Sequence, residues 1–195
     1  ADFGIHYEFN TIGNQKWAAG LVFAPSLQVN HENNLTYSNS STSEGVDKSY
    51  HSRTQYLPMH IGAGISMTTE RWVMTTDYNY LDWSRNTSSY TSMKYENQHK
   101  LNIGGAYITN PRLPRSTELM GGIGLSNSYI NLRGGKMQYL EVSAGASFPI
   151  RYSYLSLGAT WRKQINSRSS LMQESRFSMN LNITFGERIS RSKLR

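Results

Sequence analysis

The segment RFSMNLNITFGE, residues 176–187, alternates between apolar and polar residues without a break. Its odd positions hold Phe177, Met179, Leu181, Ile183 and Phe185, and its even positions hold Ser178, Asn180, Asn182, Thr184 and Gly186. Successive side chains of a β-strand point to opposite faces of the sheet, so the pattern predicts a strand with one apolar and one polar face. What covers the apolar face decides between a soluble sheet and a sheet embedded in a membrane.

The same two-residue period recurs along the chain. It is present in FGIHYEF (3–9), WAAGLVF (17–23), HIGAGISM (60–67), LNIGGAY (101–107), LEVSAGASF (140–148) and LSLGATWR (155–162). We count about nine such segments of roughly 8–12 residues, which is the length that a tilted strand needs to cross a bilayer. The sequence therefore predicts an all-β protein with an antiparallel sheet.

The second face of these segments holds Gly, Ser, Asn and Ala with scattered single charges. A soluble β-sandwich also alternates, but its outer face is usually rich in Lys, Glu, Thr and Arg. Small side chains suit the crowded or water-filled lumen of a barrel. The pattern favours an antiparallel transmembrane β-barrel over a sandwich, although the strand period itself is common to both.

Connection lengths point the same way. Short connections at residues 10–16, 68–71, 110–114 and 149–152 alternate with long ones at 30–52, 84–98, 127–138 and 164–174. Outer-membrane barrels have short periplasmic turns and longer extracellular loops. Aromatic residues near the strand ends predict membrane-interface girdles, formed by Trp17, Trp72, Tyr78, Tyr80 and Tyr107.

Composition narrows the chemistry of the 195-residue chain. Cysteine is absent, which removes disulfides and thiolate catalysis, and the formal net charge is +7. The basic residues are spread over loops and strand ends rather than gathered in a patch, so we expect no nucleic-acid partner. No apolar run approaches the roughly 18 residues of a membrane helix.

The titratable residues show no catalytic or metal-binding spacing. The five His residues form no HxH or HExxH pattern, so we predict no metal site, no cofactor, no catalytic residue and no enzymatic activity. A Ser–His pair across neighbouring strands, as in an outer-membrane lipase, is the weaker alternative.

Charged residues on the polar face are predicted to line the lumen. They are Glu8, Asp77, Lys100, Glu118, Glu141, Arg162 and Arg176. Because a lone buried charge is costly, we expect them to pair across strands. The alternative is a polar conduction path.

Residues 57–84, LPMHIGAGISMTTERWVMTTDYNYLDWS, carry a family resemblance. A Leu-Pro leads into a Gly-rich strand, a tight turn follows, and a strand that begins with Trp ends in Asp-Trp-Ser. Together with HKLNIGGAYIT and STELMGGIGLS downstream, this resembles the long-chain fatty acid transporter (FadL/TodX-like) family of outer-membrane β-barrels over roughly residues 55–190.

The resemblance implies a barrel of about fourteen strands with a hatch in its lumen. The sequence shows about nine strands and no hatch segment. We therefore expect residues 1–187 to be the C-terminal part of such a barrel. Residues 188–195 are then a basic periplasmic tail.

The long connections hold more apolar residues than solvation explains. The resemblance makes them candidates for ligand binding, and we select Tyr90, Met93, Tyr95, Tyr129 and Leu132. Loops that pack on each other, or that dock a partner protein, are the alternatives.

The first functional hypothesis is passive uptake of hydrophobic small molecules such as fatty acids. The alternative is a non-transporting barrel that serves as a subunit or shuttle of a larger outer-membrane protein assembly, in secretion or biogenesis. Either role places the chain in the bacterial (Gram-negative) outer membrane. Its expected partners are membrane lipid and lipopolysaccharide, a hydrophobic small-molecule ligand, and other outer-membrane proteins.

Overall fold

The structure is a computed structural model of the chain. It describes residues 2–10, 15–29, 32–38, 45–51, 55–88, 92–113, 115–132, 135–150, 153–166 and 173–185. The predicted tail at 188–195 and the candidate Tyr90 lie outside the described residues.

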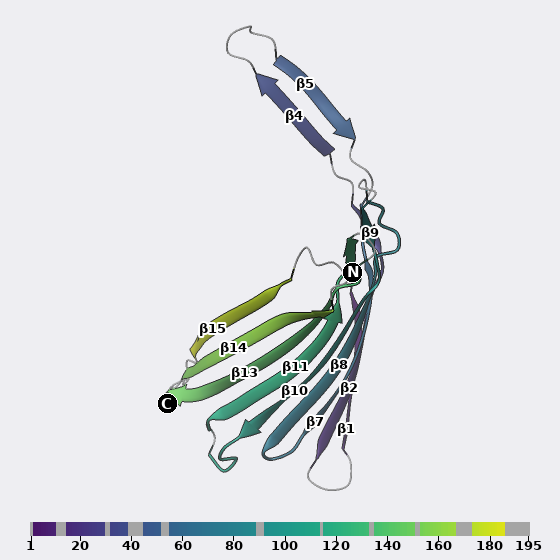
Figure 1. The fold of residues 1–195 in the computed structure, drawn as a ribbon. Helices are drawn as coiled ribbons and strands as arrows, with labels where there is room; N and C mark the ends of the chain where they lie inside the picture. Colours follow the sequence, from purple (N-terminus) through teal and green to yellow (C-terminus); the bar gives the residue numbers. More distant parts are fainter. Residues whose placement is uncertain are drawn as a thin grey trace, which may run out of the picture.

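Nine strands form one sheet. They are β1 (Phe3–Asn10), β2 (Lys16–Ala24), β7 (Met59–Thr68), β8 (Trp72–Asp82), β10 (Gln98–Ile108), β11 (Glu118–Asn127), β13 (Gln138–Ile150), β14 (Ser153–Asn166) and β15 (Ser175–Phe185). Their order in the sheet is their order in the chain, and every neighbouring pair is antiparallel. The sheet is a curved meander (Figure 1). The seven quoted alternating segments lie in these strands, apart from residues 186–187, which are outside the described residues. This confirms the all-β antiparallel prediction.

The long connections all leave from one end of the sheet, which we call the long-connection end. They link β2 to β7, β8 to β10, β11 to β13 and β14 to β15, and the other connections lie at the opposite end. This arrangement follows directly from the meander, because consecutive antiparallel strands must turn alternately at the two ends. The predicted strict alternation of long and short connections is wrong at one point: residues 109–117 between β10 and β11 number nine, and residues 167–174 between β14 and β15 number eight.

Three of the long connections contain strand pairs that the sequence pattern did not predict. The connection from β2 to β7 holds β3 (Leu27–Val29) with β6 (Gln55–Leu57) and β4 (Glu32–Ser38) with β5 (Gly45–His51). In Figure 1, β4 and β5 project away from the sheet. Similarly, β9 (Met93–Tyr95) pairs with β12 (Ile130–Leu132). Segments of three residues are too short to show a period, so alternation could not reveal most of them.

The strand register sorts side chains onto two faces. On the apolar face, one row crosses the whole sheet through Ile5, Leu21, Ala63, Tyr78, Leu101, Leu125, Leu140, Lys163 and Ser175. The next residue of each strand belongs to the polar face, with rows of Gly, Ser, Asn and charged residues. A register shift between Gln138 and Tyr139 is confined to the long-connection end of β13.

The described sheet is a single layer, and strands contact their sheet neighbours. Among the described residues, Tyr139 is the one buried hydrophobic side chain, with 8% of its surface exposed. Met179, Ile5 and Phe177 on the apolar face are 78%, 72% and 65% exposed. Within the described chain, no second sheet covers this face, so the packed core of a soluble β-sandwich is absent from it.

Strands β1 and β15 are the edges of the sheet, so the described residues form an open sheet rather than a closed barrel. No helix in the described part of the chain is long and apolar enough to span a membrane. Nor do the described His, Asp and Glu residues form a group that could hold a metal ion.

Candidate functional site at the long-connection end

Three aromatic rings stack above the ends of β8 and β11. The ring of Trp83 lies 4.6 Å from that of Tyr129 at an interplanar angle of 19°, and 6.2 Å from that of Tyr95 at 13°. The rings of Tyr95 and Tyr129 are 6.5 Å apart. Since the three residues come from two different long connections, the stack joins these connections to each other.

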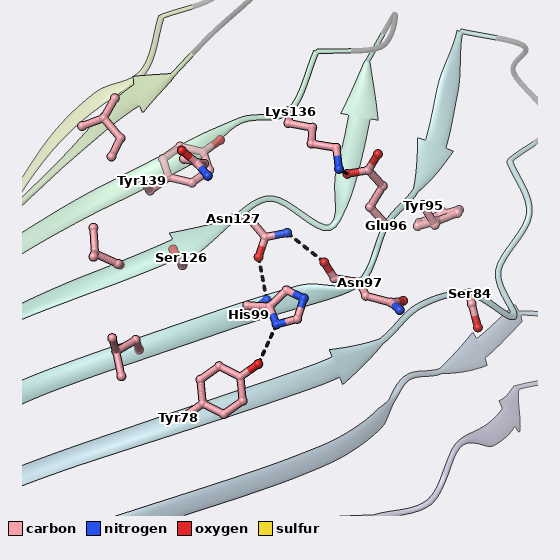
Figure 2. A pocket seen from close by; sticks show the side chains of 14 residues that line it. Tyr78, Ser84, Tyr95, Glu96, Asn97, His99, Ser126, Asn127, Lys136 and Tyr139 are labelled. Atoms are coloured by element: carbon pink, nitrogen blue, oxygen red, sulfur yellow. Dashed lines mark hydrogen bonds and ion pairs between the residues drawn. The ribbon is translucent and has the colours of Figure 1, made fainter.

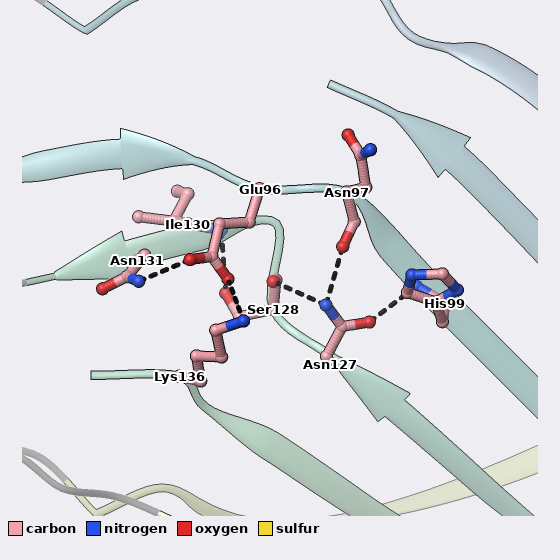
Figure 3. A network of polar contacts seen from close by, with 8 residues as sticks. All are labelled: Glu96, Asn97, His99, Asn127, Ser128, Ile130, Asn131 and Lys136. Atoms are coloured by element: carbon pink, nitrogen blue, oxygen red, sulfur yellow. Dashed lines mark hydrogen bonds and ion pairs between the residues drawn. The ribbon is translucent and has the colours of Figure 1, made fainter. Parts of the chain in front are cut away.

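Amide side chains form a second link, and Figure 3 shows its central part. Asn127 Nδ2 donates to the carbonyl of Asn97 at 2.8 Å, and the backbone N–H of His99 donates to Asn127 Oδ1 at 2.6 Å. Gln98, which is buried, donates from Nε2 to the Asn127 carbonyl at 3.0 Å. Each group of the Asn127 amide is therefore used to fix the end of β10 against the end of β11.

Glu96 anchors the strand pair β9–β12. Its Oε1 accepts a 2.6 Å hydrogen bond from Asn131 Nδ2, and its backbone N–H donates to the Tyr129 carbonyl. Its Oε2 lies 3.9 Å from Lys136 Nζ, at a site where the lysine side chain is 74% exposed. An ion pair so long and so exposed contributes little stability, so the amide contacts hold this corner.

The connection from β2 to β7 is tied in by Asn86. Its Nδ2 donates to the Tyr56 carbonyl at 2.7 Å, and its Oδ1 accepts from the Tyr56 backbone N–H at 2.9 Å. The side chain thus completes the backbone hydrogen bonding of Tyr56 as a neighbouring strand would. Three successive long connections are therefore joined into one surface, which we call the platform: residues 55–57, 83–86, 93–97 and 127–132.

A hollow of about 830 Å³ lies beside the platform (Figure 2). Its polar side is formed by Tyr78, His99 and Lys136, and its apolar side by Leu101, Leu125 and Ile165. The Tyr78 hydroxyl is 2.7 Å from His99 Nδ1.

The structure brings together four of the five candidate ligand residues. Met93 and Leu132 are register partners in β9–β12, and Tyr95 and Tyr129 belong to the ring stack. Ligand binding, packing of the long connections on each other and docking of a partner protein all stay predictions for these residues. Tyr90 lies outside the described residues.

The seven predicted lumen charges all lie on the polar face. One row across the sheet contains Asp77, Asn102, Gly124, Glu141, Arg162 and Arg176. Lys100 lies one row nearer the long-connection end. Glu8 lies one row nearer the opposite end, and Glu118 lies farther in that same direction. Within the described residues, none of these seven charges forms an ion pair with another.

These charges have other partners instead. Asp77 Oδ1 accepts hydrogen bonds from Asn79 Nδ2 at 2.7 Å and from Asn102 Nδ2 at 2.9 Å. The Arg162 guanidinium lies 4.1 Å from the centre of the Tyr139 ring, a cation–π contact. For Asp77 the amide donors lie on its own and the neighbouring strand. Among the described residues, the buried Arg162 Nε has no hydrogen-bond partner.

The predicted girdle residues all lie on the apolar face. Trp72 and Tyr107 are register partners at the short-connection end, with ring centres 4.7 Å apart, and Trp17 lies two strands away. Tyr78 and Tyr80 lie towards the long-connection end beside His99, whose ring is 5.2 Å from that of Tyr80.

Several platform residues were not among the predicted site residues: Trp83, Glu96, Asn97, Asn127 and Asn131. The one sequence feature that marks them is an Asn or an aromatic residue at the border of each long connection. Such residues are common in any β-protein, so this feature is a weak indication of a site. Their partners lie on other strands, so no local spacing reveals them.

Taken together, the fold and the platform define an all-β protein of one antiparallel meander, with one apolar face, one polar face and long connections joined at one end. A family model, BamG, matches residues 1–192, so the chain belongs to the BamG family, which is related to the BAM complex for outer-membrane protein assembly. No curated protein matches the chain.

This membership corrects the resemblance to the fatty acid transporter family, which was wrong. The quoted features, a Gly-rich strand, a tight turn and a strand that begins with Trp, are present as β7, the turn at 69–71 and β8. They describe a type of hairpin rather than one family. Fatty acid uptake, which depended on that resemblance, loses its support.

Proposed function

We propose that this chain is a membrane-embedded subunit of the outer-membrane protein assembly complex, and that it acts by docking rather than by catalysis. The family assignment supports the link to that complex. The single observation that carries the membrane location is the uncovered apolar face. Leu21, Ile103, Ile123 and Leu181 are 57%, 59%, 57% and 64% exposed, although they lie on four different strands.

Such a face is unstable in water. Soluble monomers rarely expose a continuous apolar patch larger than a few hundred Å². Lipid would cover it. The sheet strands β7, β8, β10, β11, β13, β14 and β15, with 10–14 residues each, are long enough to cross a bilayer when tilted. Aromatic side chains near both strand ends suit the two membrane interfaces.

A membrane sheet cannot keep open edges, because unpaired backbone groups are costly in lipid. Nine alternating strands make β1 and β15 run in the same direction, so a direct β1–β15 pair would be parallel. A closed antiparallel barrel needs an odd number of additional strands between these edges. We propose that residues 1–187 form part of such a barrel, with residues 188–195 as a periplasmic tail.

The platform then lies on the extracellular side, where outer-membrane barrels have their longer loops. Its long connections are tied to one another by the ring stack and by the Asn86 and Asn127 amides. A preorganised surface loses little conformational entropy on association, which favours docking to another protein. Other outer-membrane proteins of the assembly complex are the proposed partners at this surface.

The test is affinity purification of the tagged full-length protein from its own membranes in mild detergent. We expect the components of the assembly complex to co-purify with it. The matched variants are Tyr129→Ala in the platform and Leu113→Ala in a short connection, where Leu113 is 55% exposed. Tyr129→Ala should weaken co-purification and Leu113→Ala should not. Recovery of the wild-type chain in membranes without any assembly component would contradict the proposal.

A further inference from the structure

We propose that the hollow beside the platform is a binding site for a lipid that carries a phosphate head group. The inference rests on the proposed function, because it takes the apolar face as the membrane-contacting face. The hollow has the two kinds of surface that an amphiphile needs. Leu101, Leu125 and Tyr78 share one row across the strands, and the Tyr78 hydroxyl reaches His99, which lies one row nearer the long-connection end.

The apolar part of the hollow is contributed by Leu101, Leu125 and Ile165. Leu101 and Leu125 are register partners on β10 and β11, and the three side chains are 39%, 46% and 52% exposed. They are continuous with the rest of the apolar face towards the sheet centre through Ile103 and Ile123, the next register pair. An acyl chain that follows these strands would bury apolar surface along its length.

The polar part lies at the long-connection end, where the head-group region of the bilayer would be. Lys136 supplies a cation on a flexible stem, and its contact with Glu96 at 3.9 Å is weak enough to be exchanged for a phosphate oxygen. Figure 2 shows Lys136, His99 and Tyr78 around the same hollow.

His99 adds a directional donor. When the Tyr78 hydroxyl donates to Nδ1, at 2.7 Å, the neutral ring carries its proton on Nε2. Within the described residues, no acceptor is hydrogen-bonded to that nitrogen, so it can donate to an incoming phosphate. Tyr80 packs against the other side of the ring and holds its orientation.

Charge and area together select a lipid over a free anion. Glu96 and Lys136 carry opposite charges, so this pair supplies no net positive charge that would hold a solvated phosphate ion by itself. A phosphate that is tethered to an acyl chain also gains the contact with Leu101, Leu125 and Ile165. The ligand class is therefore a membrane lipid whose phosphate head group carries a net negative charge, bound by head group and chain at once.

The experiment uses the purified full-length protein in detergent and measures bound lipid by native mass spectrometry during titration. The probes are dioctanoyl phosphatidylglycerol, dioctanoyl phosphatidylcholine and inorganic phosphate. We expect the phosphatidylglycerol to bind more tightly than the phosphatidylcholine, and inorganic phosphate not to compete. Lys136→Gln should raise the Kd for phosphatidylglycerol by about fivefold, the usual effect of one basic side chain near an anionic lipid.

The matched control is Lys94→Gln, since Lys94 is an exposed lysine of the platform that does not line the hollow. Equal Kd values for the two lipids, equal losses in the two variants, or competition by inorganic phosphate would each overturn the lipid site. Co-purification of Lys136→Gln with the assembly complex is measured in parallel. If the complex forms while the lipid site fails, the proposed function stands; if the wild-type chain forms no complex, the proposed function fails independently.

Discussion

Asn102 lies across Gly124 of the neighbouring strand: its Oδ1 is 2.7 Å from the point that a Cβ atom on Gly124 would occupy. From there its Nδ2 donates to Asp77 on the other side. Asn79 covers Gly62 in the same way at 2.9 Å, and Asn180 covers Gly158. Glycine on the polar face therefore makes room for amide side chains of the neighbouring strand, and Asn102 in this way links β8, β10 and β11.

Gly124→Ala should destabilise the sheet by about 1–2 kcal/mol, because the added methyl displaces Asn102 and breaks its hydrogen bond to Asp77. The measurement is the midpoint of unfolding in urea for the protein in detergent. Gly121→Ala is the control on the same strand, since its nearest neighbour, the Ser143 carbonyl, is 3.7 Å away. Equal shifts of the urea midpoint in Gly124→Ala and Gly121→Ala would show that the hydrogen bond between Asn102 and Asp77 does not stabilise the sheet.

Trp83→Ala and Tyr129→Ala should each loosen the platform, because the two rings lie 4.6 Å apart. In a double-mutant cycle we expect a coupling energy of about 1 kcal/mol, the usual value for an aromatic pair. The readout is the rate of limited proteolysis within residues 83–97. Strictly additive rates would mean that the stack is a consequence of the fold and does not stabilise it.

Asn127→Asp should cost about 1–3 kcal/mol, because a carboxylate cannot donate to the Asn97 carbonyl and would repel it. Asn110→Asp is the matched control: Asn110 Oδ1 only accepts, from the Arg112 backbone N–H at 3.2 Å, and a carboxylate can do the same. The measurement is the thermal unfolding temperature of each variant, which should fall for Asn127→Asp and stay unchanged for Asn110→Asp. An Asn110→Asp variant as unstable as Asn127→Asp would contradict the donor role of Asn127.

Leu181→Arg tests the membrane face directly. An arginine at the lipid face of an outer-membrane barrel costs about 2–4 kcal/mol near the bilayer centre. We expect Leu181→Arg to lower the amount of folded protein in membranes, measured by the heat-dependent shift in gel mobility. Asn182→Arg, one residue later on β15 and on the polar face, should be tolerated. In a water-soluble sheet, Leu181→Arg should not lower the amount of folded protein more than Asn182→Arg does, because Leu181 is already 64% exposed.

The wrong family prediction has a physical explanation. A Gly-rich strand, a turn of a few residues and an aromatic at the start of the next strand are demanded by any tightly paired amphipathic hairpin. Leu57, Pro58 and Trp72 satisfy that demand without carrying information about cargo or partner. Family membership depends on the whole of residues 1–192, not on one hairpin.

The sequence by itself determined the nine strands, the residues on each face and the end at which each long connection lies. These are local consequences of side chains that alternate along a strand and of antiparallel strands that turn alternately. The tertiary structure alone decided which residues become neighbours across strands. Asn131 meets Glu96 and Asn86 meets Tyr56 over separations of 35 and 30 residues, and strand register rather than spacing brings them together. The platform and the hollow exist because register converts several scattered polar residues into one surface.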